Sequence, residues 1–310
     1  MSLVTETTAV ADAPSPPLPS RSAGSGAAAP EDRVTVIGPK SPWAIFDLRE
    51  VWQYRDLLLA LAERDTKLRY RQTALGPIWV LLQPLIASGV FAVVFGKIAK
   101  LSSGSIPYFL FAYVGALGWN AFQVTLNRSS GSLVSNAHLV AKVYFPRLIL
   151  PLSTLLTALI DLGVSLGLLA ILLLVNHIPF GTGLLLIPVW LLLFMTLGLG
   201  VGLITGSLMV TYRDIGQIQG VLIQFGQYAT PVGFSVAQIL ERTSQKFAIL
   251  FTINPLTYLI EGLRWSVFGN LSGGAPSPAG VAYAAAMSVL ILFFGMALFG
   301  REERRFADVI

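Results

Sequence analysis

The sequence of 310 residues contains no cysteine and few charged side chains. The absence of cysteine excludes disulfide bonds, thiolate zinc sites, cysteine nucleophiles and iron–sulfur clusters. Two histidines, His138 and His177, are too few for a metal site built mainly on imidazole. Charged residues make up 12% of the chain, about half the share typical of soluble domains, while 54% of the residues are hydrophobic and the mean hydropathy is +0.70. So few charges leave too little polar surface for a soluble globule, and the composition predicts a membrane protein.

The charges gather at the N-terminal end. Residues 1–75 hold 18 of the 37 charged side chains, and the basic residues elsewhere flank apolar segments instead of forming one patch. We therefore expect no nucleic-acid partner. Residues 1–42 are rich in Ala, Ser and Pro and lack an apolar run. They are predicted to form a disordered cytoplasmic tail, because they cannot bury enough surface to offset the entropy of ordering.

An amphipathic helix is predicted within residues 43–75. Ser41 and Pro42 suit the cap and first position of a helix, and a break is expected near Tyr54. The apolar residues recur at helical spacing, and they are Leu48, Val51, Trp52, Leu58, Leu59 and Ala62. Lys67, Arg69 and Arg71 form a basic end. We expect this interfacial helix to lie on the membrane surface, with a soluble helix packed on a partner as the alternative.

Residues 76–310 are predicted to form a six-span transmembrane domain. A helix needs about 20 apolar residues to cross the hydrocarbon core, and six stretches approach or exceed that length. They are Gly76–Phe95, Pro107–Leu126, Leu148–Val175, Leu184–Val210, Ile215–Val236 and Val281–Phe299. The fifth stretch is the weakest, because it contains four glutamines and Pro231.

The distribution of Lys and Arg predicts the orientation of these spans. Sixteen lie on the side that holds both termini and five on the other side, so both termini are predicted to be cytoplasmic. A cytoplasmic helix is expected at Leu133–Val143 in the loop 127–147, where it could dock a partner. On the outside, Phe247–Ile253 and Leu256–Ile260 are too short to span and predict re-entrant helices, separated by Asn254 and Pro255.

Asp161 is the only ionisable residue inside a predicted span. An intramembrane carboxylate is a candidate for function, but the predicted spans contain no Lys, Arg or His that could pair with it. We therefore expect Asp161 to be protonated, or hydrogen-bonded to Ser, Thr or Gln of a neighbouring helix, in a structural role.

Five segments carry a resemblance to a known family. They are RYRQTALGPIWVLLQP (Arg69–Pro84), SNAHLVAKVYFPRLILP (Ser135–Pro151), TYRDIGQ (Thr211–Gln217), NPLTYLIEGLR (Asn254–Arg264) and FADVI (Phe306–Ile310). In this order the sequence resembles the permeases of polysaccharide-exporting ABC transporters, which include the O-antigen, capsule and teichoic-acid exporters. The resemblance covers residues 43–310.

The resemblance implies a bacterial inner-membrane permease, not an enzyme, that works as a homodimer with two copies of a separate ATP-binding subunit. The chain has no P-loop sequence, and no cofactor of its own is expected. The resemblance implies that the two cytoplasmic loops dock the ATPase, and the candidate residues are Asn136, Ala137, His138, Lys142, Arg213 and Asp214.

The implied cargo is a lipid-linked polysaccharide, moved outward from the cytoplasmic leaflet. Sugar rings stack on aromatic faces, and the candidates for the path are Trp79, Gln83, Phe91, Tyr113, Trp119, Phe122, Gln224, Phe225, Gln227 and Tyr228. Lys67, Arg69 and Arg71 are candidates for attracting a lipid diphosphate, or else they only anchor the first span. The alternatives are a proton-coupled secondary transporter that uses Asp161, an ABC permease for another substrate such as a lipid or drug, and a membrane enzyme acting on lipid-linked sugars.

Overall fold

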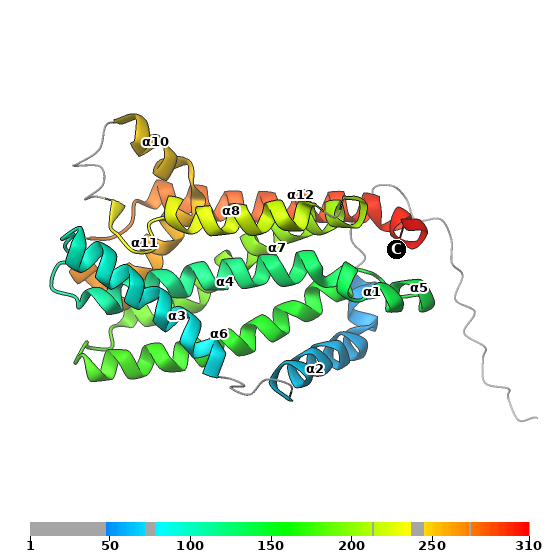
Figure 1. Cartoon of the computed structure of the whole chain (residues 1–310), viewed down its shortest axis with the longest axis horizontal. Coiled ribbons are helices and arrows are strands. Elements are labelled where there is room, and N and C mark those ends of the chain that lie inside the picture. Colours follow the sequence, from blue (N-terminus) through cyan, green and yellow to red (C-terminus); the bar gives the residue numbers. More distant parts are fainter. Residues whose placement is uncertain (1–47, 72–77, 213, 237–244, 273, 310) are drawn as a thin grey trace, which may run out of the picture. The chain divides into compact units, whose positions relative to one another are not determined.

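The computed structural model describes residues 48–71, 78–212, 214–236, 245–272 and 274–309, which form helices and turns and contain no strand (Figure 1). The chain divides into two units, Met1–Ser41 and Pro42–Ile310. The predicted tail and the predicted cap at Ser41 lie outside the described residues.

The helices follow the predicted apolar stretches closely. Their bounds are α1 (Leu48–Gln53), α2 (Arg55–Arg71), α3 (Ile78–Phe91) with the π-helical turn η1 (Ala92–Ile98), α4 (Tyr108–Ser135), α5 (Ala137–Lys142), α6 (Ile149–Val175), η2 (Thr182–Leu186), α7 (Ile187–Thr211), α8 (Ile215–Ala229), α10 (Gln245–Ile253), α11 (Pro255–Phe268), η3 (Gly269–Ser272) and α12 (Pro278–Val309). Within the described residues, five helical segments are long and apolar enough to cross a membrane: α3 with η1, α4, α6, η2 with α7, and α12 as far as Glu303. The expectation of an all-helical, multi-pass membrane protein is thereby confirmed.

Helix α4 lies at the centre of the bundle. It contacts α3, α6, α7 and α11, and α7 lies between α4 and α12. Tyr113 and Leu117 of α4 and Phe194 of α7 are fully buried at this centre. As Figure 1 shows, α1, α5 and the C-terminal end of α12 lie at one end of the bundle, and α10 and α11 lie at the other. The backbone N–H of Arg147 donates to Glu303 Oε1 at 3.0 Å, which joins the segment after α5 to α12.

Glycines let α7 approach its neighbours closely. Gly198, Gly202 and Gly206 recur every four residues and form one face of α7 against α4. A Cβ atom on Gly198 would lie 2.6 Å from the carbonyl oxygen of Phe122, and one on Gly202 would collide with Ser129 Oγ. On another face, a Cβ on Gly200 would lie 2.6 Å from the backbone nitrogen of Leu292 in α12. Small residues at this spacing allow helix backbones to touch in a membrane, where the hydrophobic effect does not drive helices together.

The second span is longer than predicted, because residues 127–135 continue α4 instead of forming a loop. This segment is polar, with the sequence NRSSGSLVS, which made it read as a connection. Its Ser129 and Ser132 hydroxyls donate to backbone carbonyls one helical turn earlier, at 2.7 Å each. The serine hydroxyls are therefore hydrogen-bonded within α4 itself. Their small side chains fit against the glycine face of α7. The predicted helix Leu133–Val143 is accordingly replaced by the end of α4, a break at Asn136, and α5.

The fifth apolar stretch, which was the weakest, forms a short helix followed by a turn. Helix α8 has 15 residues and ends at Ala229, and a turn over residues 230–234 follows. The predicted break at Asn254 and Pro255 is present: Asn254 caps α11 by accepting a 3.0 Å hydrogen bond from the N–H of Leu256, and Pro255 occupies the first helical position. Helix α11 ends at Gly269, whose φ of 58° favours glycine.

We expect the substitution Gly202→Leu to separate α4 from α7, because the new side chain would occupy the space of Ser129 Oγ. Overpacking of this kind costs about 1–3 kcal/mol or more. The purified variant should show a lower thermal unfolding midpoint and a smaller monodisperse fraction. Gly163→Leu in α6 is the matched control, since that glycine is exposed with no atom within 4 Å of a built Cβ. Equal stability of the two variants would contradict the proposed packing.

Candidate functional site

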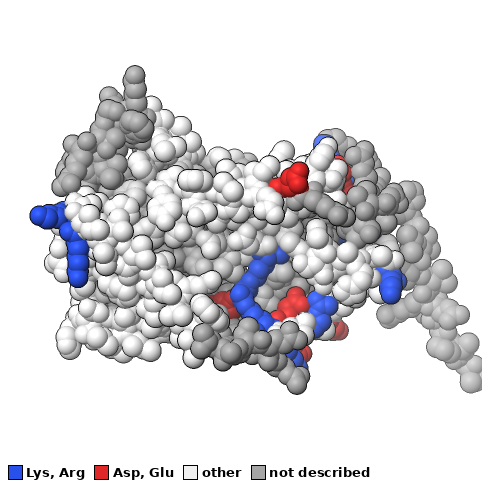
Figure 2. Space-filling view, in the orientation of Figure 1, with Lys and Arg blue, Asp and Glu red and all other residues white. Residues whose placement is uncertain are grey.

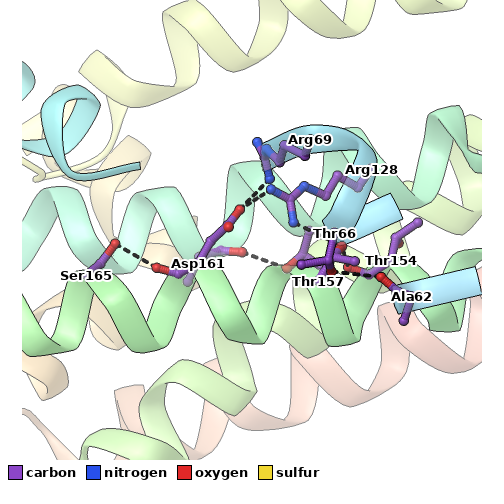
Figure 3. Close-up of polar contacts among 10 residues, drawn as sticks. Ala62, Thr66, Arg69, Arg128, Thr154, Thr157, Asp161 and Ser165 are labelled. Atoms are coloured by element: carbon purple, nitrogen blue, oxygen red, sulfur yellow. Dashed lines mark hydrogen bonds and ion pairs between the residues drawn. The ribbon is translucent and has the colours of Figure 1, made fainter. Parts of the chain in front are cut away.

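Two arginines, from α2 and α4, meet the carboxylate of Asp161 on α6 (Figure 3). Arg69 Nη1 of α2 donates to Asp161 Oδ2 at 2.5 Å, and Arg128 Nη2 of α4 donates to the same oxygen. Arg128 Nη1 also donates to Thr157 Oγ1 of α6 at 3.1 Å. The side chain of Asp161 is 8% exposed and that of Arg128 17%, whereas that of Arg69 is 46% exposed. The cluster is therefore buried at the carboxylate and open at Arg69.

The expectation that no cation reaches Asp161 was wrong. Arg128 was assigned to a loop, but α4 extends through it and carries its guanidinium alongside α6. Arg69 comes from α2, which packs against α6. Both guanidinium groups donate charge-assisted hydrogen bonds to the carboxylate. No local signal in the sequence placed Arg128 in a helix, because the polar residues around it are those of an ordinary connection between spans.

The predicted basic end of α2 is only partly available for a ligand. Lys67 is exposed and pairs with Glu63 one helical turn away, and Arg69 pairs with Asp161. Arg71 ends α2, but its side chain lies outside the described residues. Figure 2 shows basic and acidic side chains side by side in a hollow on this side of the molecule. The predicted headgroup site at the end of α2 is thus a mixed cluster of charges instead of a set of three cations.

The predicted path residues separate into an exposed set and a buried set. Trp79 and Gln83 of α3 and Phe225, Tyr228 and Gln224 of α8 are exposed, and Gln227 is half-buried. Phe91, Tyr113, Trp119 and Phe122 are buried.

Ring contacts join α3 to α8. The rings of Phe91 and Tyr228 meet edge to face with centroids 6.1 Å apart. Trp119 of α4 packs behind α8, where a Cβ atom on Gly226 would lie 3.1 Å from the indole ring. The hydroxyl of Tyr113 donates to the carbonyl oxygen of Ser165 at 2.9 Å, so Tyr113 binds α4 to α6. The exposed aromatic face therefore belongs to α3 and α8, and of the buried rings Phe91 and Trp119 pack against α8.

A buried arginine holds the turn that follows α8. Arg264 of α11 is 3% exposed, donates to the carbonyl oxygens of Val232 at 2.6 Å and Phe234 at 3.0 Å, and lies 3.7 Å from the ring centroid of Phe111. The hydroxyl of Tyr108 donates to the carbonyl oxygen of Gly233 at 2.7 Å. Three consecutive carbonyl groups of one turn are thus satisfied by side chains of α4 and α11, where water has little access. In the sequence Arg264 appeared only as the last residue of the segment Asn254–Arg264, with no role assigned.

The charge of Arg264 is retained despite its burial. Burial lowers the pKa of Arg264 and raises the pKa of Glu261 one turn earlier, and the opposite charges of the two residues counter both changes. A guanidinium is so basic that it stays protonated at neutral pH. The turn is therefore held by a permanent cation.

The predicted docking residues lie around α5. Asn136 is buried at the break before α5, where its side-chain oxygen accepts a 2.7 Å hydrogen bond from Arg64 of α2. Ala137 is half-buried, and His138 and Lys142 are exposed. Asp214 is exposed just before α8, and Arg213 lies outside the described residues. Asn136 therefore fixes the position of α5, while His138 and Lys142 offer an accessible surface.

Comparisons with known proteins find a family and relatives along most of the chain. The model of the ABC-2 type transporter family matches residues 56–268, from α2 to the end of α11. The O-antigen export system permease protein RfbA of Myxococcus xanthus is 28% identical over 85% of this chain and 98% of its own length. RfbA of Klebsiella pneumoniae is 26% identical over 82% of this chain and 95% of its own length. The polysialic acid transport protein KpsM of Escherichia coli is 25% identical over 79% and 92%.

We expect Arg264→Met to destabilise the protein, because it leaves the carbonyl groups of Val232 and Phe234 without donors. Each unsatisfied buried group costs about 1–3 kcal/mol. Thermal unfolding of the purified protein should show a lower midpoint, and Arg264→Lys should restore only part of the loss, because an ammonium lacks the planar fork. The control Lys97→Met changes an exposed cation of η1. If Arg264→Met unfolds at the same temperature as Lys97→Met, the arginine does not hold the turn.

Proposed function

Since the chain belongs to the ABC-2 type transporter family, we propose that it is the membrane-spanning subunit of an ATP-driven exporter of cell-envelope polysaccharide. The observation that carries this proposal is the extent of the likeness. Relatives named for O-antigen export and for polysialic acid transport match over more than nine-tenths of their own length. ATP is bound and hydrolysed by a separate subunit.

In the proposed topology the chain crosses the bacterial inner membrane six times, with both termini in the cytoplasm. The five long helices supply five spans, and α8 with the turn that follows it supplies the sixth. The excess of Lys and Arg on the side of the termini supports this orientation. Helices α10 and α11 are then external and re-entrant, and α5 projects into the cytoplasm.

The exporter is proposed to be a homodimer whose path lies along α3 and α8. Helix α8 leaves Leu222, Phe225 and Tyr228 exposed beside Gln224, a mixture of rings and amides that suits sugars better than lipid tails. A second copy facing this surface would enclose a conduit between two such faces. The buried Trp119 packs behind α8 at Gly226 and supports this face.

The cargo is proposed to be a glycan on a lipid diphosphate, collected near α2 at the cytoplasmic leaflet. A phosphate headgroup there would meet Lys67 and Arg69, and basic residues next to a membrane surface attract such anions. We favour this function over a proton-coupled transporter, because the carboxylate of Asp161 is already engaged by two guanidinium groups.

Deletion of the gene tests the function directly. We expect lipid-linked glycan to accumulate on the cytoplasmic side and the surface glycan to disappear, with both restored by the wild-type gene. The measurement is glycan analysis of the cell surface and of the lipid-linked pool. Normal surface glycan, in a strain without a related permease, would refute the proposal.

Crosslinking tests the proposed docking of the ATPase. The chain has no cysteine, so His138→Cys introduces a unique thiol on the exposed side of α5. It should crosslink to a cysteine on the ATPase subunit in at least one nucleotide state. Gly181→Cys, exposed between α6 and α7, is the matched control and should not react with that subunit. If Gly181→Cys crosslinks and His138→Cys does not, the orientation is reversed.

A further inference from the structure

A pocket opens between three helices at the end of the bundle that holds α10 and α11 (Figure 1). Its volume is about 380 Å³, within the range of about 300–1,000 Å³ that is typical of sites for small molecules. We call it the tyrosine pocket. It is lined by the last residues of α10, by the first turn of α11 and by the start of α12, and its main side chains are Thr252, Ile253, Tyr258, Ser277 and Tyr283.

Both tyrosine rings are held in fixed positions and remain half-buried. The hydroxyl of Tyr258 donates to the carbonyl oxygen of Thr252 at 3.1 Å, and that of Tyr283 donates to the carbonyl oxygen of Ile253 at 2.7 Å. The two rings meet edge to face, with centroids 6.1 Å apart. A Cβ atom on Gly280 would lie 2.3 Å from the ring of Tyr258, so that ring lies directly against the backbone of α12. The pocket therefore has two preformed aromatic walls.

The chemistry of the walls suits a neutral sugar unit. Among the described residues, those that line the tyrosine pocket carry no charge, so an anion would find no cation there. The face of an aromatic ring is partly negative and attracts the C–H groups on the face of a sugar ring. The phenol oxygens can still accept a hydrogen bond, and Ser277 Oγ, which accepts from the N–H of Gly280 at 3.2 Å, can still donate one. A lipid tail would leave these hydroxyl groups without partners.

The pocket lies next to the external end of the proposed path. Tyr228 is exposed on α8, which ends one residue later. Thr230 Oγ1 then accepts a 2.9 Å hydrogen bond from the side chain of Asn254, and Asn254 directly follows Ile253 in the wall of the pocket. A glycan that leaves the face of α8 at this end therefore meets the junction of α10 and α11 next. The pocket itself belongs to α10, α11 and α12 and is separate from the path on α3 and α8.

We propose that the tyrosine pocket binds a neutral sugar unit of the glycan after that unit has left the path. The proposal rests on the function proposed above and adds an external sugar site to it. Ring faces of Tyr258 and Tyr283 hold the sugar, and the hydroxyl groups at the rim hydrogen-bond to it. Binding on the outer side stabilises the exported part of the chain, and so it opposes the return of the glycan while the ATPase subunit resets.

Glycan binding to the assembled exporter tests this site. The permease with its ATPase subunit is placed in nanodiscs, and the probe is the surface glycan of wild-type cells, released from its lipid. Ala279→Trp fills the pocket from an exposed position in the first turn of α12. We expect it to weaken binding of the glycan by about tenfold or more, the effect of losing one well-placed contact. Ala286→Trp, exposed two turns further along α12 and outside the pocket, is the matched control and should bind like the wild type.

Two further variants separate binding by the ring from support of α10. Tyr258→Ala removes one aromatic wall and should also weaken binding of the glycan by about tenfold. Tyr258→Phe keeps the wall and removes only the hydroxyl that contacts Thr252, so it should retain most of the binding. If Tyr258 served only to hold α10, the two variants would lose binding equally. If Ala279→Trp does not assemble, this pair decides.

The outcomes separate this site from the function on which it rests. If deletion of the gene abolishes the surface glycan but Ala279→Trp binds that glycan as well as Ala286→Trp does, the pocket belongs to the lipid interface, and the function stands without it. Polysialic acid, an anionic glycan, should not compete with the probe, and competition that Ala279→Trp abolishes would overturn the assignment to a neutral sugar. A surface glycan that survives deletion of the gene contradicts the function, and the sugar site falls with it.

Discussion

The carboxylate of Asp161 constrains three helices at once. It lies near the middle of α6, where a lone charge would be costly, and the cations that neutralise it come from α2 and α4. Helix α4 must therefore extend far enough to carry Arg128, and α2 must lie against α6 to bring Arg69. Arg64 of the same α2 reaches Asn136 at the start of α5. The positions of α2 and α5 thus follow from the same set of polar contacts.

At the other end of the bundle, too, buried polar groups require partners within the protein. Carbonyl groups of the turn after α8 cannot rely on water, and Arg264 and Tyr108 supply the donors. Asn254, which caps α11, also donates to Thr230 Oγ1 at the start of that turn at 2.9 Å. Between the two ends, glycines on two faces of α7 replace the side-chain packing of a soluble core with backbone contact. Hydrogen bonds and ion pairs to buried polar groups therefore hold the ends of the bundle, and contacts through small residues hold its middle.

This packing leaves two separate surfaces exposed, one on α3 and α8 and one on α5. Helices α3 and α8 share the contact between Phe91 and Tyr228, and on α8 Phe225 remains uncovered. Helix α5 leaves His138 and Lys142 accessible at the end of the bundle where α12 finishes. The surface proposed for the cargo and the surface proposed for the ATPase therefore lie on different helices. Helix α4 contacts α3, α8 and α5 and so connects the two surfaces.

The apolar stretches and their breakers determined most of the secondary structure by themselves. Long runs without charge can only be helices in a membrane, and Asn254 with Pro255 marked the start of α11 because a cap and a fixed φ act locally. Family membership was equally legible, because its motifs are contiguous segments. The extent of α4 and the partners of Asp161 and Arg264 were decided by tertiary structure. Each depends on groups dozens of residues away along the chain, and one-dimensional periodicity contains no information about which distant helices meet.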